Sequence, residues 1–459
     1  MNTRHIHFIG IGGIGMSGLA LVAKAAGYTV SGCDTNASQK TVQNLTSHDC
    51  QIAEQHGGHI CFDPSITLMV YSTDTQRPMA EKEAALQNNS KVIHRSELLA
   101  YFMDTKTAIA ITGAHGKTTT TGLLSHIFMQ LGLEPTCIIG GISTTLNANA
   151  LQGNGPFLIA EADESDRSFI ILPAAIKVIT NIDFEHVETY ANIDDIKKAC
   201  LTFLHNHQEK TIAHVLCIDN QPIKDILPLI KVPYQTYGTS ERADIHITDV
   251  HLFPFHSTFT IHCKKNNLST SCTLPIPGIH NVLNATGAIT AAYVAGVDIA
   301  DAAALLHTFK GVDRRFTIRG RYNNALVIDD YAHHPSEIHN TITAAKKSTK
   351  GKLYVFYQPH RITRTIGLWN NFVQLWQNND EVDHVFIMDI YTAGETIPTT
   401  LSSKDLIKSI NKKNCDYVEN DIIAIKKALT TVQVTDADTI LFLGAGNISQ
   451  QSIVLTCNQ

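Results

Sequence analysis

The sequence lacks the cysteine and histidine spacings that usually hold a structural zinc ion. Its ten cysteines include no C-x-x-C pair, and its 23 histidines include no H-E-x-x-H segment. Single cysteines scattered along 459 residues indicate reduced, mostly buried thiols, not a disulfide framework. We expect most of the histidines to pack in the interior or to lie at the surface.

The sequence is also poor in charge, and it has no excess of positive charge. Charged residues make up 17% and aromatic residues 7%, whereas hydrophobic residues make up 44%. This composition is typical of a globular protein and argues against disordered, collagen-like and coiled-coil chains. The net charge of −6 offers no general attraction for nucleic acid or for an anionic membrane, so we expect neither as a partner.

Apart from segment 6–22, no apolar run approaches the ~18 residues that a membrane span needs. Segment 6–22 is largely apolar, follows Arg4 and leads into Ala23-Lys24-Ala25, which imitates a signal-peptide cleavage site. Five glycines between residues 10 and 18 interrupt it, and glycine weakens the helix that a signal peptide forms. We therefore expect a cytoplasmic protein, and the sequence leaves monomer and homodimer open.

Short apolar runs alternate with longer helix-like segments, which predicts an α/β fold with mostly parallel sheets. Strands are predicted at 5–9, 68–71, 108–112, 157–160, 178–181, 326–329, 353–357, 385–388 and 439–443. Helices are predicted at 16–26, 118–130, 194–205, 281–295, 336–346 and 368–377. In segment 232–276, threonine, histidine and phenylalanine alternate with polar residues, which predicts an antiparallel meander.

At ~150 residues per domain, the length suggests about three domains. Breaks in the pattern fall near 103–106 and 311–317, so we expect blocks at 1–106, 107–313 and 314–459.

The first glycine loop, residues 10–15, follows a strand and opens a helix. Gly10, Gly12, Gly13 and Gly15 carry the dinucleotide fingerprint, and Asp34 follows at a second strand end, as expected for an acid that binds a ribose hydroxyl. The pattern places a diphosphate on a helix N-terminus without naming the nucleotide. It leaves open NAD(P) or FAD, another nucleotide diphosphate, or a structural turn.

The second glycine loop, residues 113–117, also lies between a strand and a helix. Its backbone N–H groups can cradle phosphate, Lys117 can span the β- and γ-phosphates, and a threonine hydroxyl can reach Mg²⁺. A strict G-x-x-x-x-G-K-[ST] loop has glycine five residues before Gly116, but that residue is Ile111 here. The first glycine of this loop is Gly113. We expect ATP to bind here. The alternative is a turn beside an ordinary surface lysine.

Acids follow the next two predicted strands, as a magnesium-dependent ATP site requires. Segment 161–166 reads E-A-D-E-S-D, and Asp183, Glu185 and His186 come after the strand at 178–181. Because Mg²⁺ prefers hard oxygen ligands and retains several waters, one or two of these carboxylates would suffice.

Segments along essentially the whole chain resemble, in the same order, the Mur ligase family. They read G-I-G-G-I-G-M-S-G, T-G-A-H-G-K-T-T-T-T, E-A-D-E-S-D, T-N-I-D-F-E-H-V-E-T-Y, H-N-V-L-N-A-T, G-V-D-R-R-F, D-D-Y-A-H-H-P-S-E, Q-P-H-R-I-T-R-T and G-A-G-N-I. The resemblance implies a Rossmann-like N-terminal domain for a UDP-sugar. It also implies a central P-loop-type ATPase and a Rossmann-like C-terminal domain for an amino acid.

The activity implied by the resemblance is ATP-dependent ligation of L-alanine to the lactyl carboxylate of UDP-N-acetylmuramate through an acyl phosphate. ADP and phosphate are the other products, and the step belongs to peptidoglycan biosynthesis. The metal would be Mg²⁺, with Mn²⁺ left open.

The resemblance also implies residue roles. The proposed catalytic group comprises Lys117, Glu161, His186 and Arg315, with Thr118, Glu161 and His186 as metal ligands. The ATP set is Gly113, Ala114, His115, Gly116, Lys117, Thr118, Thr119, Asn281, Asn284, Arg315 and Asp330. The UDP-sugar set is Gly10, Gly12, Gly13, Gly15, Asp34 and Ser72. The amino-acid set is Tyr331, His333, His360, Arg361 and Arg364.

The sequence departs from the family pattern at two positions. Ala114 replaces a threonine, which removes a hydroxyl near the phosphates, and Ala332 replaces a glycine beside the expected amino-acid pocket. Lys197 and Lys198 follow His186, but neither matches the lysine that sister enzymes carbamylate, so that role is not transferred.

Three other activities fit parts of the sequence. A ligase that attaches a murein tripeptide to the same nucleotide sugar is the nearest. An NAD(P)-dependent oxidoreductase explains only the first glycine loop. A non-catalytic ATP-binding scaffold leaves Lys117, Glu161, His186 and Arg315 without a use.

Overall fold

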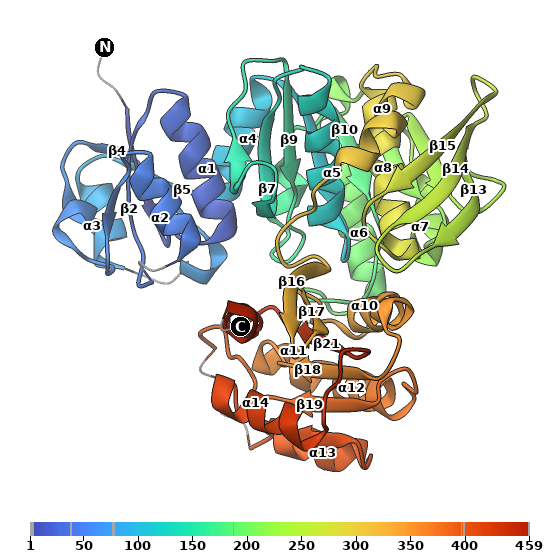
Figure 1. Cartoon of the computed structure of the whole chain (residues 1–459). Coiled ribbons are helices and arrows are strands. Elements are labelled where there is room, and N and C mark those ends of the chain that lie inside the picture. Colours follow the sequence, from blue (N-terminus) through green and yellow to red (C-terminus); the bar gives the residue numbers. More distant parts are fainter. Residues whose placement is uncertain are drawn as a thin grey trace.

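Three α/β domains follow one another along the chain in this computed structural model, each built around its own sheet (Figure 1). The structure describes residues 4–36, 39–75, 79–186, 188–395, 397 and 400–457. The predicted fold class is confirmed: the sheets are mostly parallel, and helices separate their strands.

The N-terminal sheet is Rossmann-like, with strand order β3-β2-β1-β4-β5 and every neighbouring pair parallel. The central strand β1 is buried along its whole length, as expected for a parallel sheet covered on both faces. Its elements are β1 (His5–Ile9), α1 (Ile14–Ala25), β2 (Thr29–Cys33), α2 (Lys40–Ser47), β3 (Gln51–Ala53), η1 (His59–Phe62), β4 (Ile66–Tyr71), η2 (Thr73–Thr75), α3 (Ala80–Gln87), β5 (Lys91–His94) and α4 (Arg95–Asp104).

The middle sheet has the order β15-β14-β13-β12-β11-β10-β6-β9-β7-β8. Its elements are β6 (Thr107–Thr112), α5 (Lys117–Gln130), β7 (Thr136–Ser143), β8 (Ala148–Leu151), β9 (Phe157–Glu161), η3 (Ser168–Ile171), β10 (Ile176–Ile179), α6 (Ile193–His205), η4 (Gln208–Lys210), β11 (His214–Cys217), α7 (Gln221–Ile226), η5 (Leu227–Leu229), β12 (Tyr234–Gly238), β13 (Ile245–Leu252), β14 (Ser257–Cys263), β15 (Leu268–Leu274), α8 (Ile279–Val294), α9 (Ile299–Leu305) and η6 (Leu306–Thr308).

The C-terminal sheet has the order β16-β17-β21-β18-β19-β20, with only the edge strand β16 antiparallel. Its elements are β16 (Thr317–Tyr322), β17 (Ala325–Asp330), α10 (Pro335–Ser348), β18 (Leu353–Tyr357), α11 (Ile362–Gly367), α12 (Trp369–Gln377), β19 (His384–Ile387), α13 (Ser403–Ile410), β20 (Cys415–Tyr417), α14 (Ile422–Thr431), β21 (Thr439–Leu443) and α15 (Ile448–Cys457).

Every strand and helix that the sequence predicts is present, with small shifts at the ends. The prediction for 232–276 is wrong in one respect. β12 pairs in parallel with β11 and also with β13, so only β13, β14 and β15 form an antiparallel meander. Alternation within a strand shows which residues face the core, but it carries no information on the direction of the neighbouring strand.

The N-terminal and middle domains are joined through α1. The Asn149 side chain on β8 is 1% exposed, and its Nδ2 donates to the Ile14 carbonyl (2.6 Å) and to Ser17 Oγ (2.9 Å). These bonds lie in the first turns of α1, directly after the first glycine loop. The middle domain therefore holds the helix N-terminus that this loop opens.

All ten cysteines are free thiols, and all except Cys457 are buried, as the sequence predicts. Across the parts of the chain that the structure describes, no helix has the length and apolarity needed to cross a membrane.

His214 generates a stability prediction for the middle domain. The ring is fully buried on β11, its Nε2 hydrogen-bonds the Leu204 carbonyl (2.9 Å), and burial lowers its pKa to about 4. Between about pH 6.5 and pH 4 the unfolded chain binds a proton that the folded chain excludes, so stability falls as the pH falls through this range.

We expect His214→Gln to reduce the loss of Tm between pH 7 and pH 5 by about 4 °C, since glutamine keeps a donor and does not titrate in this range. Calorimetric melting at the two pH values measures this difference. The matched control is His251→Gln, because His251 is exposed on β13. Equal pH sensitivity in the two variants would contradict the assignment.

Candidate functional site

The second glycine loop lies at the carboxyl end of β6, between the carboxyl ends of its parallel neighbours β9 and β10. Gly113 (φ +131°) and Gly116 (φ +84°) take left-handed backbone conformations. A Cβ on Gly113 would lie 2.3 Å from Thr180 Oγ1, and one on Gly116 would lie 2.2 Å from Asn284 Oδ1. Only glycine fits both positions, and the loop is thereby pressed against β10 and α8.

Lys117 is the first residue of α5, and its ammonium turns back over the loop. Nζ donates to the carbonyls of Gly113 (2.7 Å) and Ala114 (3.3 Å) and pairs with Glu164 Oε1 (2.9 Å). Burial disfavours the charge, but Glu164 and Glu161 outweigh it and raise the Lys117 pKa above its ordinary value. A permanently charged ammonium therefore faces the space beside the loop.

Thr118 and Glu161, two of the predicted metal ligands, are in contact. Thr118 Oγ1 donates to Glu161 Oε2 (2.9 Å), which also accepts from the Gly140 backbone N–H (3.1 Å). Arg315 of the C-terminal domain donates from Nη2 to Thr118 Oγ1 (3.2 Å). Burial raises the pKa of Glu161. A hydroxyl, a carboxylate and an arginine from two domains thus meet at one point.

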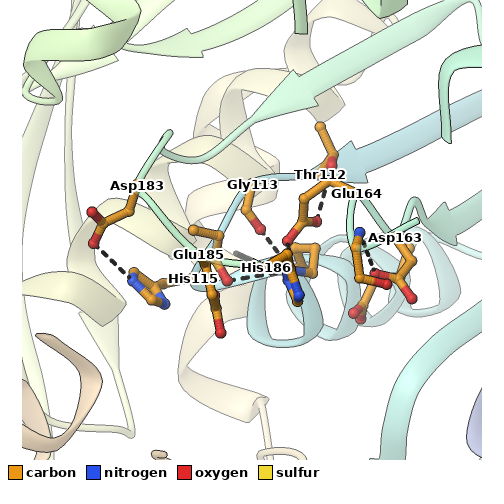
Figure 2. A network of polar contacts seen from close by, with 12 residues as sticks. Thr112, Gly113, His115, Asp163, Glu164, Asp183, Glu185 and His186 are labelled. Carbon is orange, nitrogen blue, oxygen red and sulfur yellow. Dashed lines mark hydrogen bonds and ion pairs between the residues drawn. The ribbon is translucent and has the colours of Figure 1, made fainter. Parts of the chain in front are cut away.

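His186, the third predicted metal ligand, lies in a second cluster together with Glu164 and Glu185 (Figure 2). Ligand atoms of Glu164, Glu185 and His186 all lie within 4.8 Å of one another, and His186 Nε2 is 3.3 Å from Glu164 Oε1. Burial opposes the imidazolium charge, but the nearby carboxylates of Glu164 and Glu188 prevail and raise the His186 pKa to about 10. The sequence placed Glu164 and Glu185 among the acids expected near magnesium without assigning a role to either, because nothing in the acidic segments distinguishes them from their neighbours.

His115 connects the loop to the C-terminal domain through its side chain. Its ring nitrogens lie 3.2 Å from Asp183 Oδ2 and 3.1 Å from Glu337 Oε1. Burial lowers its pKa, yet these two hydrogen bonds outweigh burial and bring the pKa to about 10. Its backbone N–H donates to Asn181 Oδ1 (2.9 Å). Both the loop backbone and the charge of His115 are therefore fixed.

A cavity of about 290 Å³ opens beside the second glycine loop and brings together predicted ATP residues from distant segments. Asn281 and Asn284 are buried side by side on α8, and Asn284 Nδ2 donates to Asn281 Oδ1 (3.3 Å). The lining includes His115, Gly116, Thr119, Tyr237, Asn281, Asn284, Arg315 and Asp330.

Asp330 enters this cavity from the end of β17. Its two oxygens accept from the backbone N–H groups of Phe316 (2.6 Å) and Ala332 (2.8 Å). Burial raises its pKa to about 6.

The first glycine loop borders a separate cavity of about 560 Å³ between the N-terminal and middle domains. Gly10, Gly13, Gly15, Asp34 and Ser72 line it, together with Arg95, Glu161 and Asp163. Gly12 has a different place: its N–H donates to Asp34 Oδ2 (2.9 Å), while Asp34 Oδ1 accepts from the Asn36 N–H (3.0 Å). Both oxygens of Asp34 therefore already hold loop backbone, in addition to bordering the cavity.

A third cavity, also about 560 Å³, joins all three domains. Ser72 lines it from the N-terminal domain, and Lys117, Thr118, Glu161 and His186 line it from the middle domain. The C-terminal domain contributes Arg315, Tyr331, His333, His360, Arg361 and Arg364. The five predicted amino-acid residues thus face the second glycine loop across one space.

Ion pairs with the middle domain hold these C-terminal residues. Arg364 Nη2 lies 3.2 Å from Glu185 Oε1, and Arg361 Nη1 lies 3.2 Å from Glu188 Oε1. His333 Nε2 is 3.6 Å from the same Glu185 oxygen. The partner of Arg364 is therefore a buried acid at the centre of the site.

Comparison with known proteins supports one family throughout the chain. Residues 5–107 match the Mur ligase family catalytic domain, 111–292 the Mur ligase middle domain, and 314–446 the Mur ligase glutamate ligase domain. A UDP-N-acetylmuramate--L-alanine ligase of Geotalea uraniireducens is 39% identical over 448 residues, covering 97% of this chain and 96% of the relative.

Two solved structures are similar along nearly the full length. The UDP-N-acetylmuramate-alanine ligase of Thermotoga maritima has a TM-score of 0.80 at 29% identity, covering 98% of each chain. A murein peptide ligase of Psychrobacter arcticus has a TM-score of 0.73 at 24% identity, covering 99% of each chain, which shows a shared fold. With all three of its domains matched in order, the chain belongs to the Mur ligase family.

Proposed function

We propose that the chain ligates L-alanine to the lactyl carboxylate of UDP-N-acetylmuramate in the cytoplasm, consuming ATP and releasing ADP and phosphate. The printed names of its full-length relatives support this substrate pair. The observation that carries the proposal is the cavity shared by all three domains. It places Ser72, Lys117 and Arg364 around one space, as a reaction among three substrates requires.

The three blocks take one substrate each in this proposal. Residues 1–106 bind the UDP-sugar through the first glycine loop, residues 107–313 bind ATP, and residues 314–459 bind the amino acid. The positions of the three cavities support this division, because each predicted residue set borders the expected one.

The chemistry follows from the need to activate a carboxylate. The lactyl carboxylate attacks the γ-phosphorus of ATP, ADP leaves, and an acyl phosphate forms. The amine of L-alanine then attacks the acyl carbon, and phosphate leaves from the tetrahedral intermediate. Lys117 and Arg315 face the reacting groups with fixed positive charge, so they neutralise charge that develops on phosphate oxygens.

The donor set fits a divalent metal. Thr118 and Glu161 would hold one Mg²⁺, and His186 would help to hold a second together with Glu164 and Glu185. The carboxylate oxygens are the hard ligands that Mg²⁺ or Mn²⁺ prefers. When bound, the metal would neutralise phosphate charge. Lys117 and His186 both pair with Glu164, and Arg315 donates to the Thr118 hydroxyl that contacts Glu161.

Two arginines support the proposed amino-acid pocket. Arg361 and Arg364 present guanidinium groups suited to a free α-carboxylate. Burial lowers the pKa of His360 to about 2, so this imidazole is neutral and adds no charge to the pocket.

A matrix of substrates tests the proposed function directly. We expect ADP and phosphate release only when UDP-N-acetylmuramate, L-alanine, ATP and Mg²⁺ are all present. The murein tripeptide is the comparison acceptor, and each substrate is omitted in turn as the control. Release with the tripeptide and none with L-alanine would assign the chain to tripeptide recycling.

Lys117→Ala tests the phosphate site. Removing a fixed cation from the phosphates should lower the ligation rate by at least about 10²-fold. The rate is followed as ADP release, and a melting curve checks that the variant is folded. Lys224→Ala is the matched control, because Lys224 is exposed on α7. Equal rates in the two variants would refute the phosphate-binding role.

Glu161→Gln tests the metal site. The glutamine amide keeps an acceptor for Thr118 but loses the negative charge. The Mg²⁺ concentration that gives half-maximal activity should therefore rise at least about tenfold. Chelator-treated enzyme is titrated with Mg²⁺ at saturating ATP. Glu241→Gln, on an exposed loop of the middle domain, is the control. An unchanged Mg²⁺ requirement would exclude Glu161 as a ligand.

A further inference from the structure

Five side chains with metal-ligating atoms meet in the N-terminal domain, and none of them lines the cavities described above. His7 lies on β1, Cys33 ends β2, Cys61 lies in η1 and Glu81 lies in the first turn of α3. His56 comes from the loop between β3 and η1. They belong to separate segments of the chain, and the proposed ligation reaction uses none of them.

The ligand atoms are close enough to share one ion. One atom each from His7, Cys33 and Cys61 lie within 4.8 Å of one another, and the same holds for Cys33, His56 and Glu81. Cys33 Sγ is 3.1 Å from His56 Nδ1, which is 4.0 Å from Glu81 Oε1. Cys33 thus belongs to both groups and lies at the centre of the cluster.

Two buried polar atoms in the cluster have no hydrogen-bond partner. His7 is 0% exposed, and its Nε2 makes no hydrogen bond, whereas its Nδ1 bonds Ser31 Oγ (2.8 Å). Glu81 is 3% exposed, and its Oε1 makes no hydrogen bond. Buried polar atoms without partners are costly, so their presence in one cluster indicates a missing ligand.

We propose that Cys33, Cys61 and His7 bind a Zn²⁺ ion, with the fourth ligand supplied by His56 or Glu81. Two thiolates and an imidazole select Zn²⁺ over Mg²⁺, which prefers oxygen. The bond from Ser31 to His7 Nδ1 leaves Nε2 for the metal, as ligating histidines usually require. The His56 side chain is 23% exposed, so the cluster has a path to solvent.

Such an ion would fix the first glycine loop. The Cys33 carbonyl accepts from the backbone N–H groups of Gly10 (2.8 Å) and Ile11 (3.1 Å). Holding the Cys33 side chain on a metal therefore restrains the loop backbone through the Cys33 carbonyl. The sequence gives no indication of this site, since its ligands are not grouped by a short spacing.

Cobalt substitution of the full chain tests the proposal without any activity measurement. Demetallated protein, kept reduced with a phosphine, is titrated with Co²⁺ and then with Zn²⁺. We expect one equivalent of Co²⁺ with thiolate-to-metal charge-transfer absorption, which Zn²⁺ abolishes by displacement. Cys33→Ser and Cys61→Ser should each weaken binding at least about tenfold and reduce the absorption.

Matched controls separate the cluster from other thiols and from the acidic site. Cys50→Ser removes another buried cysteine of the same domain and should leave the titration unchanged. His56→Ala and Glu81→Gln identify the fourth ligand, which is the one whose loss weakens binding. Wild-type protein without charge-transfer absorption, or with absorption that survives both Cys33→Ser and Cys61→Ser, would overturn the proposal. So would recovery of a Cys33–Cys61 disulfide from metal-free protein purified without oxygen.

Discussion

Compensation of buried negative charge assembles the site where the three domains meet. Glu161 ends β9, Glu164 lies in the loop that follows it, and Glu185 lies in the loop after β10. Glu164 and Glu185 are buried, and a buried carboxylate without a partner is costly. Lys117 balances Glu164 from within the domain, whereas Arg364 comes from the C-terminal domain to balance Glu185. Docking of the C-terminal domain and completion of the site are therefore one event, since the same ion pairs do both.

The start of α10 shows how local helix chemistry contributes to this arrangement. His334 caps the helix, and Glu337 Oε2 accepts from the His334 backbone N–H (3.4 Å) in a capping box. The other oxygen, Oε1, reaches His115 of the second glycine loop. The four-residue signature that begins α10 thus orients a carboxylate toward another domain.

Much of the fold and part of the site could be predicted from sequence, for identifiable reasons. Strands such as 353–357 are continuous apolar runs, and Lys117 follows a glycine loop, so both are encoded locally. Glu164 and Glu185 could not be selected from the acids around them, because their importance comes from distances across the fold to Lys117, His186 and Arg364. The parallel pairing of β12 with β13 was missed for the same reason: strand direction depends on how the intervening chain returns.

The hydrogen bonds from Asn149 to the first turns of α1 have a mechanical consequence. They tie the glycine loop of the N-terminal domain to the middle sheet by direct backbone and hydroxyl contacts. Charged pairs among long side chains help attach the C-terminal domain to the middle domain, and water and ions can replace such pairs. Ion pairs also cross the interface between the N-terminal and middle domains, where Arg95 lies 2.8 Å from Asp163. Added salt would therefore weaken the charged contacts of both interfaces, whereas the neutral bonds of Asn149 would remain.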